Sequence, residues 1–318
     1  MIGKKAMVPK SIADKKILVL GDSILDRTVM AEAIGVSLET PTLKAKESSN
    51  NLHFGGASNV VNNILSLGAS CTFITLLGDD EYLDSYLNWR SKKLELIPII
   101  ECRENVVKSR FWVTKSGNSY KHLQINRGDK TNITEESFKK LLTIYKQKIN
   151  EVDVVLFVDY GIGLFKDSYK IQRLLTIAKE NNKITIVSSQ ISDGDNRYPN
   201  FKGASFFCMN EEEAKKNLNS FSHDDDSINE LSALLQSSIC VTLGKDGCIF
   251  SNGSSIIKTD SVPVNVKDTC GAGDSFLAAF SVCSDQHDFK FCNLWAGLST
   301  MTIGTICPKI SDIYEFSC

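Results

Sequence analysis

Extremes of composition are missing from this 318-residue sequence. Proline occurs only six times, and the 36 Lys and Arg residues nearly balance the 38 Asp and Glu residues. The formal net charge of −2 excludes a general electrostatic drive toward nucleic acid. With 42% hydrophobic and 23% charged residues, the chain is neither collagen-like nor strongly disordered. Its length predicts one large or two medium domains, with a core that needs no disulfides.

Long hydrophobic runs and metal-binding patterns are missing as well. No apolar run approaches the ~18 residues of a membrane span, and Ile17–Leu20 is too short for the core of a signal sequence. The ten cysteines form no Cys-x-x-Cys pair, and none of the four histidines flanks a cysteine at zinc-binding spacing. These absences predict a cytoplasmic protein with reduced thiols that binds neither a membrane nor nucleic acid. Short basic pairs such as Lys139-Lys140 are interpreted as solvated helix faces.

Two common nucleotide-binding motifs are also absent. No Gly-x-Gly-x-x-Gly follows the first expected strand, and Gly161-Ile162-Gly163 lacks the third glycine. Gly244-Lys245 is followed by Asp246 and not by the Ser or Thr of a P-loop. Both a dinucleotide-dependent dehydrogenase and a P-loop enzyme are therefore disfavoured.

Short apolar runs alternate with segments of helical spacing along most of the chain. We expect strands at residues 17–20, 72–77, 154–158, 184–187, 205–208 and 239–243. We expect helices at residues 59–67, 137–149, 168–180 and 211–218. This alternation is typical of an α/β protein with a mainly parallel sheet, helices on both faces and right-handed connections.

Two segments break this alternation and predict strands outside the main sheet. Residues 38–54 and 105–127 are rich in Thr, Ser and Lys and carry alternating apolar residues. In the second segment, RFWVT and SYKHLQI flank Lys115–Asn118, a pattern typical of a β-hairpin. We expect both segments to form a small β lid inserted in a single domain that spans residues 1–318.

The strongest functional signal is the segment Asp268–Ser281, DTCGAGDSFLAAFS. The small residues Gly271, Ala272 and Gly273 precede an apolar helical run, so backbone can approach a ligand closely at a helix N-terminus. Unpaired N–H groups and the positive end of the helix dipole suit a phosphate there. Asp274 is then a candidate general base that takes a proton from a substrate hydroxyl. The structural alternative is a plain glycine-rich turn capped by Asp274.

This segment resembles the C-terminal signature of the ribokinase-like, or PfkB-type, carbohydrate kinases. Four further elements match that family in order along the chain. They are Asp26 in GDSILD, the GGASN motif at Gly55–Asn59, Asn210-Glu211-Glu212-Glu213, and Val241–Gly247. Val61 departs from the small residue that is usual in the GG signature. The resemblance implies a three-layer α/β/α sandwich with a mainly parallel central sheet and a small β lid, which transfers a phosphoryl group from ATP to a sugar.

The resemblance also implies a role for each matching residue. Gly271, Ala272 and Gly273 would hold the γ-phosphate, and Asp274 would be the catalytic base. The residues implied for ATP are Asn210, Glu213, Thr242, Gly244 and Gly247, with Asn210 and Glu213 positioning Mg²⁺ through water. Those implied for the sugar are Asp26, Gly55, Gly56, Asn59, Arg110 and Gln124, and those for a monovalent cation such as K⁺ are Asp268 and Thr269. A homodimer paired through the lids is implied as well.

Several of these residues have a structural interpretation beside the functional one. Asn210 and Glu213 have the spacing of a helix cap, and Asp159 is either a strand-end cap or a site residue. Gln124 on the lid hairpin faces either substrate or solvent. Trp112, on the same hairpin, is better explained by packing than by stacking on a sugar.

Within the family, the chain resembles the heptose-phosphate kinases of ADP-heptose synthesis and related kinases of surface-polysaccharide clusters. The similarity lies in Ser37–Lys46, in Asp159–Gly163 and in the basic lid positions Lys108 and Arg110. Two lysines of that branch are missing, because Ile162 replaces the lysine of Asp-Tyr-x-Lys-Gly and Ser188-Ser189-Gln190 replaces Asp-Pro-Lys. Each lost contact to a phosphate weakens binding by roughly 1.5–3 kcal/mol. The substrate is therefore a neutral sugar or a phosphosugar held by other cations.

Two other functions fit the same sequence. One is a nucleoside or other small-alcohol kinase on the same fold, which only a substrate panel separates from a sugar kinase. The other is a sugar- or nucleotide-binding regulator that has lost catalysis. The intact Gly-Ala-Gly-Asp at 271–274 disfavours the regulator, because a sensor needs no catalytic base.

Overall fold

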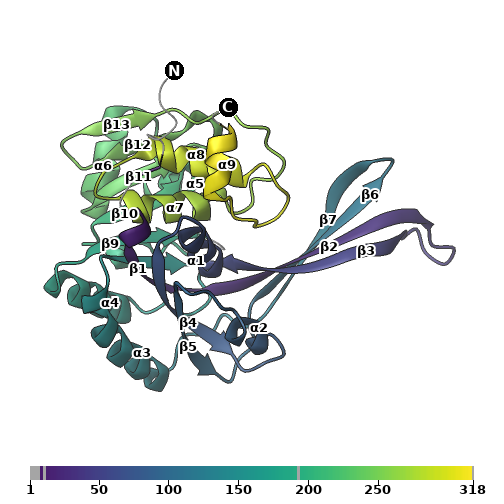
Figure 1. Cartoon of the computed structure of the whole chain (residues 1–318), viewed down its shortest axis with the longest axis horizontal. Coiled ribbons are helices and arrows are strands. Elements are labelled where there is room, and N and C mark those ends of the chain that lie inside the picture. The colour runs from purple at the N-terminus through teal and green to yellow at the C-terminus, as the bar shows by residue number, and fades with distance from the viewer. Residues whose placement is uncertain (1–7, 10–11, 192–193, 317–318) are drawn as a thin grey trace.

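A nine-stranded sheet forms the centre of the computed structural model, which describes residues 8–9, 12–191 and 194–316 (Figure 1). The strand order is β13-β12-β11-β10-β9-β8-β1-β4-β5. The strands are β1 (Lys16–Gly21), β4 (Ser70–Gly78), β5 (Leu94–Glu101), β8 (Val154–Asp159), β9 (Ile184–Ser189), β10 (Phe206–Asn210), β11 (Ser238–Thr242), β12 (Cys248–Ser251) and β13 (Ile256–Thr259). Neighbouring strands from β11 to β5 pair in parallel, and β12 and β13 add an antiparallel edge.

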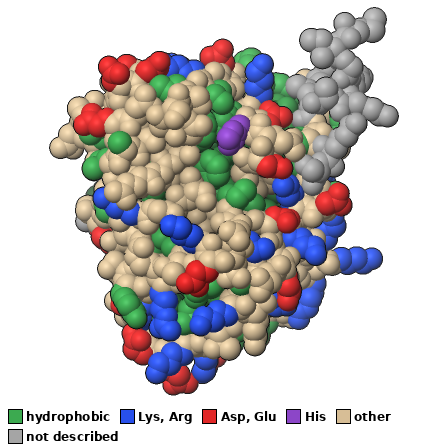
Figure 2. All heavy atoms as spheres, turned by 90° about the vertical axis from the view of Figure 1, so that its left-hand side faces the viewer, with side chains coloured by type: hydrophobic (Ala, Val, Ile, Leu, Met, Phe, Trp, Pro, Cys, Tyr) green, Lys and Arg blue, Asp and Glu red, His purple; other side chains and the backbone are tan. Residues whose placement is uncertain are grey.

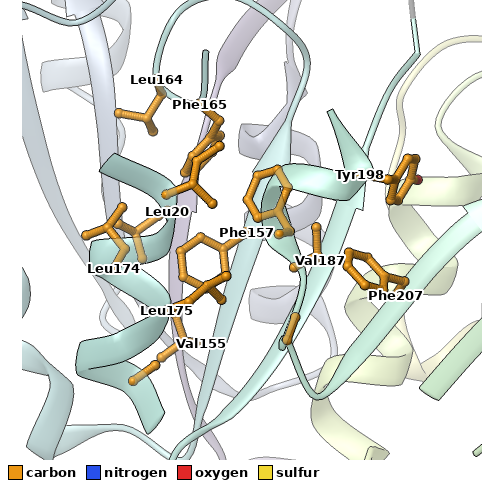
Figure 3. Close-up of a cluster of buried hydrophobic side chains, with 14 of the residues drawn as sticks. Leu20, Val155, Phe157, Leu164, Phe165, Leu174, Leu175, Val187, Tyr198 and Phe207 are labelled. Atoms are coloured by element: carbon orange, nitrogen blue, oxygen red, sulfur yellow. The ribbon is translucent and has the colours of Figure 1, made fainter. Parts of the chain in front are cut away.

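Helices cover both faces of this sheet because its strands are apolar on both sides. In β1, Leu18 and Leu20 belong to one buried core, and Ile17 and Val19 belong to the other. The first core is closed by α3 (Glu135–Lys148), α4 (Ser168–Glu180) and α6 (Asp225–Leu235), and Figure 3 shows part of it. The second is closed by α1 (Ala57–Ser66), α7 (Ala272–Cys283) and α8 (Phe289–Ser299). The shorter helices are α2 (Leu83–Leu87), α5 (Glu211–Asn217) and α9 (Ile310–Phe316).

Every strand and helix expected from the sequence coincides with an observed element. The pattern does not predict β5, β12 or β13. Strand β5 contains Pro98, which argues against a central strand but is tolerated here because β5 lies at the sheet edge. Strands β12 and β13 have only four residues each, too few to show a period.

A second, four-stranded sheet forms the lid, in the order β3-β2-β6-β7, and extends away from the body of the protein (Figure 1). Its strands are β2 (Ser23–Val36), β3 (Leu43–Gly56), β6 (Val107–Lys115) and β7 (Asn118–Arg127). The expected lid segments, 38–54 and 105–127, omit β2, so Asp26 lies on a lid strand and not in a loop after β1. The β6–β7 hairpin turns at Ser116 and Gly117, whose φ angles of 52° and 82° match the predicted tight turn.

Charges of both signs are interspersed on the face shown in Figure 2. Lys140 pairs with Glu136 and Lys215 with Glu211, each one turn apart on its own helix. These pairs agree with the interpretation of the short basic clusters as solvated faces. Within the described residues, no helix is long and apolar enough to cross a membrane.

Candidate active site

A cavity of about 130 Å³ lies at the carboxyl ends of the parallel strands. The ends of β8, β9, β10 and β11 contribute Asp159, Ser188, Asn210 and Thr242 to its wall. Residues Gly273 and Asp274 of the first turn of α7 close it from the other side. Open parallel sheets bind ligands at this edge, so the cavity lies where the fold favours a site.

Asp274 occupies the first turn of α7, and both of its carboxylate oxygens are already held. Asn59 Nδ2 donates to Oδ2 at 2.9 Å, and the Tyr160 hydroxyl donates to Oδ1 at 2.5 Å. Burial raises the pKa of Asp274 to about 6, although both hydrogen bonds act in the opposite direction. The residue therefore changes protonation near neutral pH, as a general base requires. The helix begins after Gly271, so Asp274 is not its cap.

The two glycines around Ala272 meet different surroundings. Gly271 has a φ of 81°, and a Cβ there would lie 2.7 Å from Asn59 Nδ2. A Cβ on Gly273 would meet no atom within 4 Å, because this position faces the open cavity. Gly271 is needed by the fold, whereas Gly273 leaves room for a ligand beside the helix N-terminus.

Asp26 lies at the base of the lid in a buried ion pair. Its side chain is 8% exposed, and Arg110 Nη1 donates to Oδ1 at 2.5 Å. A Cβ on Gly55 would lie 2.3 Å from Asp26 Oδ2, and one on Gly56 would lie 2.7 Å from the Asp22 carbonyl oxygen. The glycines of the GG motif therefore let β3 pack directly against the two aspartates.

Lys108 lies next to this pair and has no anionic partner of its own. It stands opposite Asp26 in the β2–β6 register, and its Nζ lies 5.5 Å from the centre of the Tyr160 ring. Within the described residues its ammonium makes no ion pair and no hydrogen bond. Burial lowers the pKa of Lys108, while the nearby carboxylates of Asp26 and Asp274 raise it. An ammonium without an ion-pair partner therefore lies near both carboxylates.

Asp22 is a buried acid that the sequence analysis does not single out. Its side chain accepts from the backbone N–H groups of Tyr160 and Ile162 at 3.0 Å and of Leu164 at 3.3 Å. Burial and the neighbouring Asp159 carboxylate raise the pKa of Asp22 to about 6. Its sequence position, directly after a buried strand, is the signal that could have identified it.

The two segments that lack the lysines make other contacts in this chain. Ile162 is 7% exposed in an apolar cluster with Ile24 and Val106. Asp159, whose pKa burial raises, accepts from Ser189 Oγ at 2.6 Å and from Arg197 Nε at 2.7 Å. Asp159 thus lines the cavity and forms a buried ion pair with Arg197.

Asn210 and Glu213 form the capping box of α5, and both also line the cavity. Glu213 Oε2 also accepts from the Tyr198 hydroxyl at 3.1 Å, and burial raises the pKa of Glu213. Thr242 lines the same cavity at the end of β11, where a short turn from Gly244 leads to Gly247 and β12. The structural and the functional interpretations of these residues are therefore compatible.

Asp268 ties the segment before α7 to the loop near Gly304. Its Oδ1 accepts from the Cys270 N–H at 3.1 Å, and its Oδ2 accepts from the Gly304 N–H at 2.9 Å. The Thr269 carbonyl accepts from the Ala272 N–H at 3.2 Å. Among the described residues, no three His, Cys, Asp or Glu side chains are grouped so as to hold a metal ion.

The polar residues of the β6–β7 hairpin lie on two opposite faces of the lid. Gln124 stands opposite Arg110 and donates to Asn126 Oδ1 at 3.0 Å, so both lie on the lid face that carries Asp26. Arg127 lies on the opposite face and pairs with Glu81 at 2.7 Å. Arg127 is therefore a surface ion-pair residue.

Known proteins resemble this chain along most of its length. A family model described as pfkB family carbohydrate kinase matches residues 14–292. Relatives named bifunctional protein HldE are 29% identical in Aliarcobacter butzleri and 28% identical in Helicobacter pylori, each over 314 residues. These alignments cover 94% of this chain but only 64% and 65% of the relatives. The chain thus spans less than two thirds of the length of these relatives.

Solved structures of low sequence identity have the same architecture. Phosphofructokinase-2 from Escherichia coli, in complex with potassium, aligns with a TM-score of 0.74 at 19% identity. Ribokinase from Thermotoga maritima aligns with a TM-score of 0.72 at 22% identity. Both alignments cover 95% of this chain and 99% of the other. The expected ribokinase-like sandwich is therefore confirmed.

Proposed function

Because the chain belongs to the pfkB family of carbohydrate kinases, we propose that it transfers the γ-phosphoryl group of ATP to a hydroxyl of a sugar or sugar phosphate. The observation that carries the proposal is the placement of Asp274. Asp274 lies in the N-terminal turn of α7 and lines the cavity, and its pKa is raised to about 6. Phosphoryl transfer needs such a base beside a site for the phosphate.

In the proposed reaction the γ-phosphate rests against the backbone of Gly271–Asp274, where the helix dipole favours negative charge. Asp274 accepts the proton of the sugar hydroxyl while the hydroxyl oxygen attacks the γ-phosphorus and ADP leaves. In this proposal Asp26, at the base of the lid, binds the sugar. Positioning and electrostatics then supply most of the rate acceleration.

Mg²⁺ would enter this site with ATP. The cavity offers side-chain oxygens from Asn210, Glu213 and Thr242, but they form no ready-made cage among the described residues. This donor set suits an ion that keeps waters and binds chiefly to phosphates, and the ion would neutralise phosphate charge. For a monovalent cation such as K⁺, Asp268 and the Thr269 carbonyl are the proposed ligands, since their oxygens keep free lone pairs beside one N–H donor each.

For the sugar we propose contacts to Asp26, Asn59, Gln124 and the backbone at Gly55–Gly56. A heptose or heptose phosphate is the substrate class that we place first, because of the resemblance to heptose-phosphate kinases. Arg110 is already neutralised by Asp26, so Lys108 is the cation that is free to meet a phosphate on the sugar. A charged substrate is thus compatible with the absence of the two lysines.

The proposal is tested by following ADP release from ATP and Mg²⁺ over a substrate panel. The panel contains heptose 7-phosphate, unphosphorylated heptoses, ribose, fructose and its phosphates, and nucleosides. Turnover of a sugar supports the proposal. A preference between each sugar and its phosphorylated form shows whether the substrate is neutral or charged. Preference for a nucleoside would instead support the alternative that the protein is a nucleoside kinase. Nucleotide binding without turnover of any member would contradict catalysis.

Replacing Gly273 with Ala should affect stability and nucleotide binding in opposite directions. Alanine is the better helix residue, and a methyl group there meets no atom of the protein, so the free energy of unfolding should rise by about 0.5 kcal/mol. The same methyl group fills the space proposed for the γ-phosphate, so KM for ATP should rise by roughly tenfold. Thermal unfolding and steady-state kinetics measure the two effects.

Gly271→Ala is the matched comparison for this prediction. Its positive φ and the 2.7 Å approach to Asn59 Nδ2 should destabilise the protein by roughly 1–3 kcal/mol. If Gly273→Ala left KM for ATP unchanged, the phosphate could not lie against Gly273.

We also propose a homodimer that forms through the outer face of the lid. Leu52, Tyr120, Leu123 and Ile125 lie on the face opposite Asp26 and are 41–60% exposed. A dimer that buries this apolar row should become monomeric in a Leu123→Lys, Ile125→Lys variant, as measured by sedimentation velocity. Tyr169→Lys, an exposed position on α4, is the control. A wild-type monomer at all concentrations would refute the dimer.

The cytoplasm is the proposed location of the protein. The nine cysteines of the described residues are all free thiols, which suits a reducing compartment that also supplies ATP.

A further inference from the structure

Tyr160 contacts the proposed base more closely than any other side chain described here. Its hydroxyl donates to Asp274 Oδ1 at 2.5 Å, and the two residues are 114 positions apart in the sequence. Asn59 holds the second carboxylate oxygen at 2.9 Å. Each oxygen keeps a further lone pair, so the carboxylate can still accept a proton from a ligand in the cavity.

The backbone around Tyr160 is fixed by buried charges. Asp22 accepts from the N–H groups of Tyr160 and Ile162, each at 3.0 Å, and Asp159 accepts from the Gly161 N–H at 2.8 Å. Arg103 donates to the Ile162 carbonyl at 3.0 Å. Several charge-assisted hydrogen bonds therefore determine where the loop after β8 places the tyrosine.

The ring of Tyr160 is held between the lid and the main domain. It packs against the cluster of Ile24, Val106 and Ile162 at the base of the lid, and Lys108 Nζ lies 5.5 Å from its centre. With both its backbone and its ring held, the hydroxyl has little freedom to leave Asp274. The hydrogen bond between Tyr160 and Asp274 is thus fixed by the packing around it and does not depend on a mobile surface side chain.

The direction of the hydrogen bond follows from the acidity of the two groups. Burial and the Asp274 carboxylate raise the pKa of Tyr160 well above its ordinary value, so the phenol keeps its proton and donates. A donor of this kind stabilises the ionised carboxylate and lowers the pKa of Asp274 relative to a site without it. Lys108 also favours the ionised Asp274 carboxylate, whereas the Asp26 carboxylate disfavours it. The thiols of Cys270 and Cys307 also lie near Asp274, and burial together with its carboxylate raises their pKa values, so both thiols are neutral.

We propose that Tyr160 is a positioning residue for the catalytic base, which keeps Asp274 ionised at neutral pH and directs its free lone pair toward the substrate hydroxyl. This inference rests on the proposed function, since it assigns Asp274 the role of base. During transfer the substrate proton moves to Asp274, the new P–O bond forms at the hydroxyl oxygen, and the bond to ADP breaks. Tyr160 retains its own proton throughout and only stabilises the carboxylate that accepts one.

The test is the pH dependence of kcat in Tyr160→Phe, which removes only the hydroxyl. Losing one hydrogen bond to a charged group should move the acidic limb of the profile upward by about one pH unit. Near pH 6, where the limb of the wild-type protein is expected, kcat should fall about fivefold. Near pH 8 it should change by less than about threefold, because Asp274 is then ionised in both proteins. KM for ATP should not change.

A purely structural role for the hydroxyl would lower kcat equally at all pH values, and an unshifted limb would overturn the proposal. Tyr145→Phe is the matched control, because this buried tyrosine donates to the Leu174 carbonyl in α4, in the opposite core. It should leave the profile unchanged. Thermal unfolding of both variants shows whether they fold.

A second measurement needs no substrate and separates this inference from the proposed function. The carboxyl pKa of Asp274 is followed by ¹³C NMR titration of aspartate-labelled protein, with Asp274→Asn used to assign the signal. A higher pKa in Tyr160→Phe than in the wild-type protein supports the inference even if no sugar in the panel is turned over. An unchanged pKa refutes it even if the kinase activity is established.

Discussion

Asp274→Asn is expected to lower kcat by at least ~100-fold, the lower end of what a general base contributes. Asparagine keeps the shape of the side chain and can still accept from Asn59 or Tyr160, but it cannot take the proton of the substrate hydroxyl. KM for ATP should change little, since the phosphate is proposed to contact backbone. Steady-state ADP release on the preferred sugar measures the effect. A variant with near-normal turnover would exclude Asp274 as the base.

This loss of activity should come without a loss of stability. The pKa of Asp274 in the folded protein is raised to about 6, above its value in the unfolded chain. Ionisation therefore costs stability as the pH rises through about 4 to 6, and asparagine removes this cost at neutral pH. The melting temperature of Asp274→Asn near neutral pH should equal or exceed that of the wild-type protein. Asp226→Asn, an exposed acid at the start of α6, is the control for both measurements.

Asp26→Ala is expected to lower kcat/KM for the sugar by roughly 100-fold, mainly through KM. Hydrogen bonds between a substrate and a charged group contribute about 1.5–3 kcal/mol, and the unpaired Arg110 would add a penalty. KM for ATP should stay within about twofold, because Asp26 lies on the lid and not among the residues proposed for the nucleotide. Titrating sugar and ATP separately distinguishes the two effects.

Two comparisons make the interpretation of Asp26→Ala specific. Asp285→Ala removes an exposed aspartate paired with Lys15 and should leave the kinetics unchanged. The double variant Asp26→Ala, Arg110→Ala removes the unpaired cation but restores no sugar contact. If it recovered wild-type KM, Asp26 would serve only to neutralise Arg110, and its role in sugar binding would be excluded.

The sequence by itself predicts the local features of this protein, namely its strands, helices, turns and short motifs. Strands such as Val154–Asp159 and helices such as Ser168–Glu180 follow from local hydrophobic period and caps. The turn at Ser116-Gly117 follows from Gly117, because glycine adopts a positive φ without steric cost. The family follows from short motifs of fixed spacing. The sequence therefore determines the fold class and proposes Asp274 as the reactive residue.

The tertiary structure decides which distant residues meet at Asp274. Asn59 is 215 positions away from it, and Tyr160 is 114 positions away, so no local period or spacing connects them. It also decides that Asp26 lies on a lid strand and pairs with Arg110, and that Ile162 is buried in an apolar cluster with Ile24 and Val106. These contacts arise where strand ends, a helix N-terminus and the lid meet. Packing of the whole chain sets that meeting point, because a local pattern fixes only which residues neighbour each other within one element.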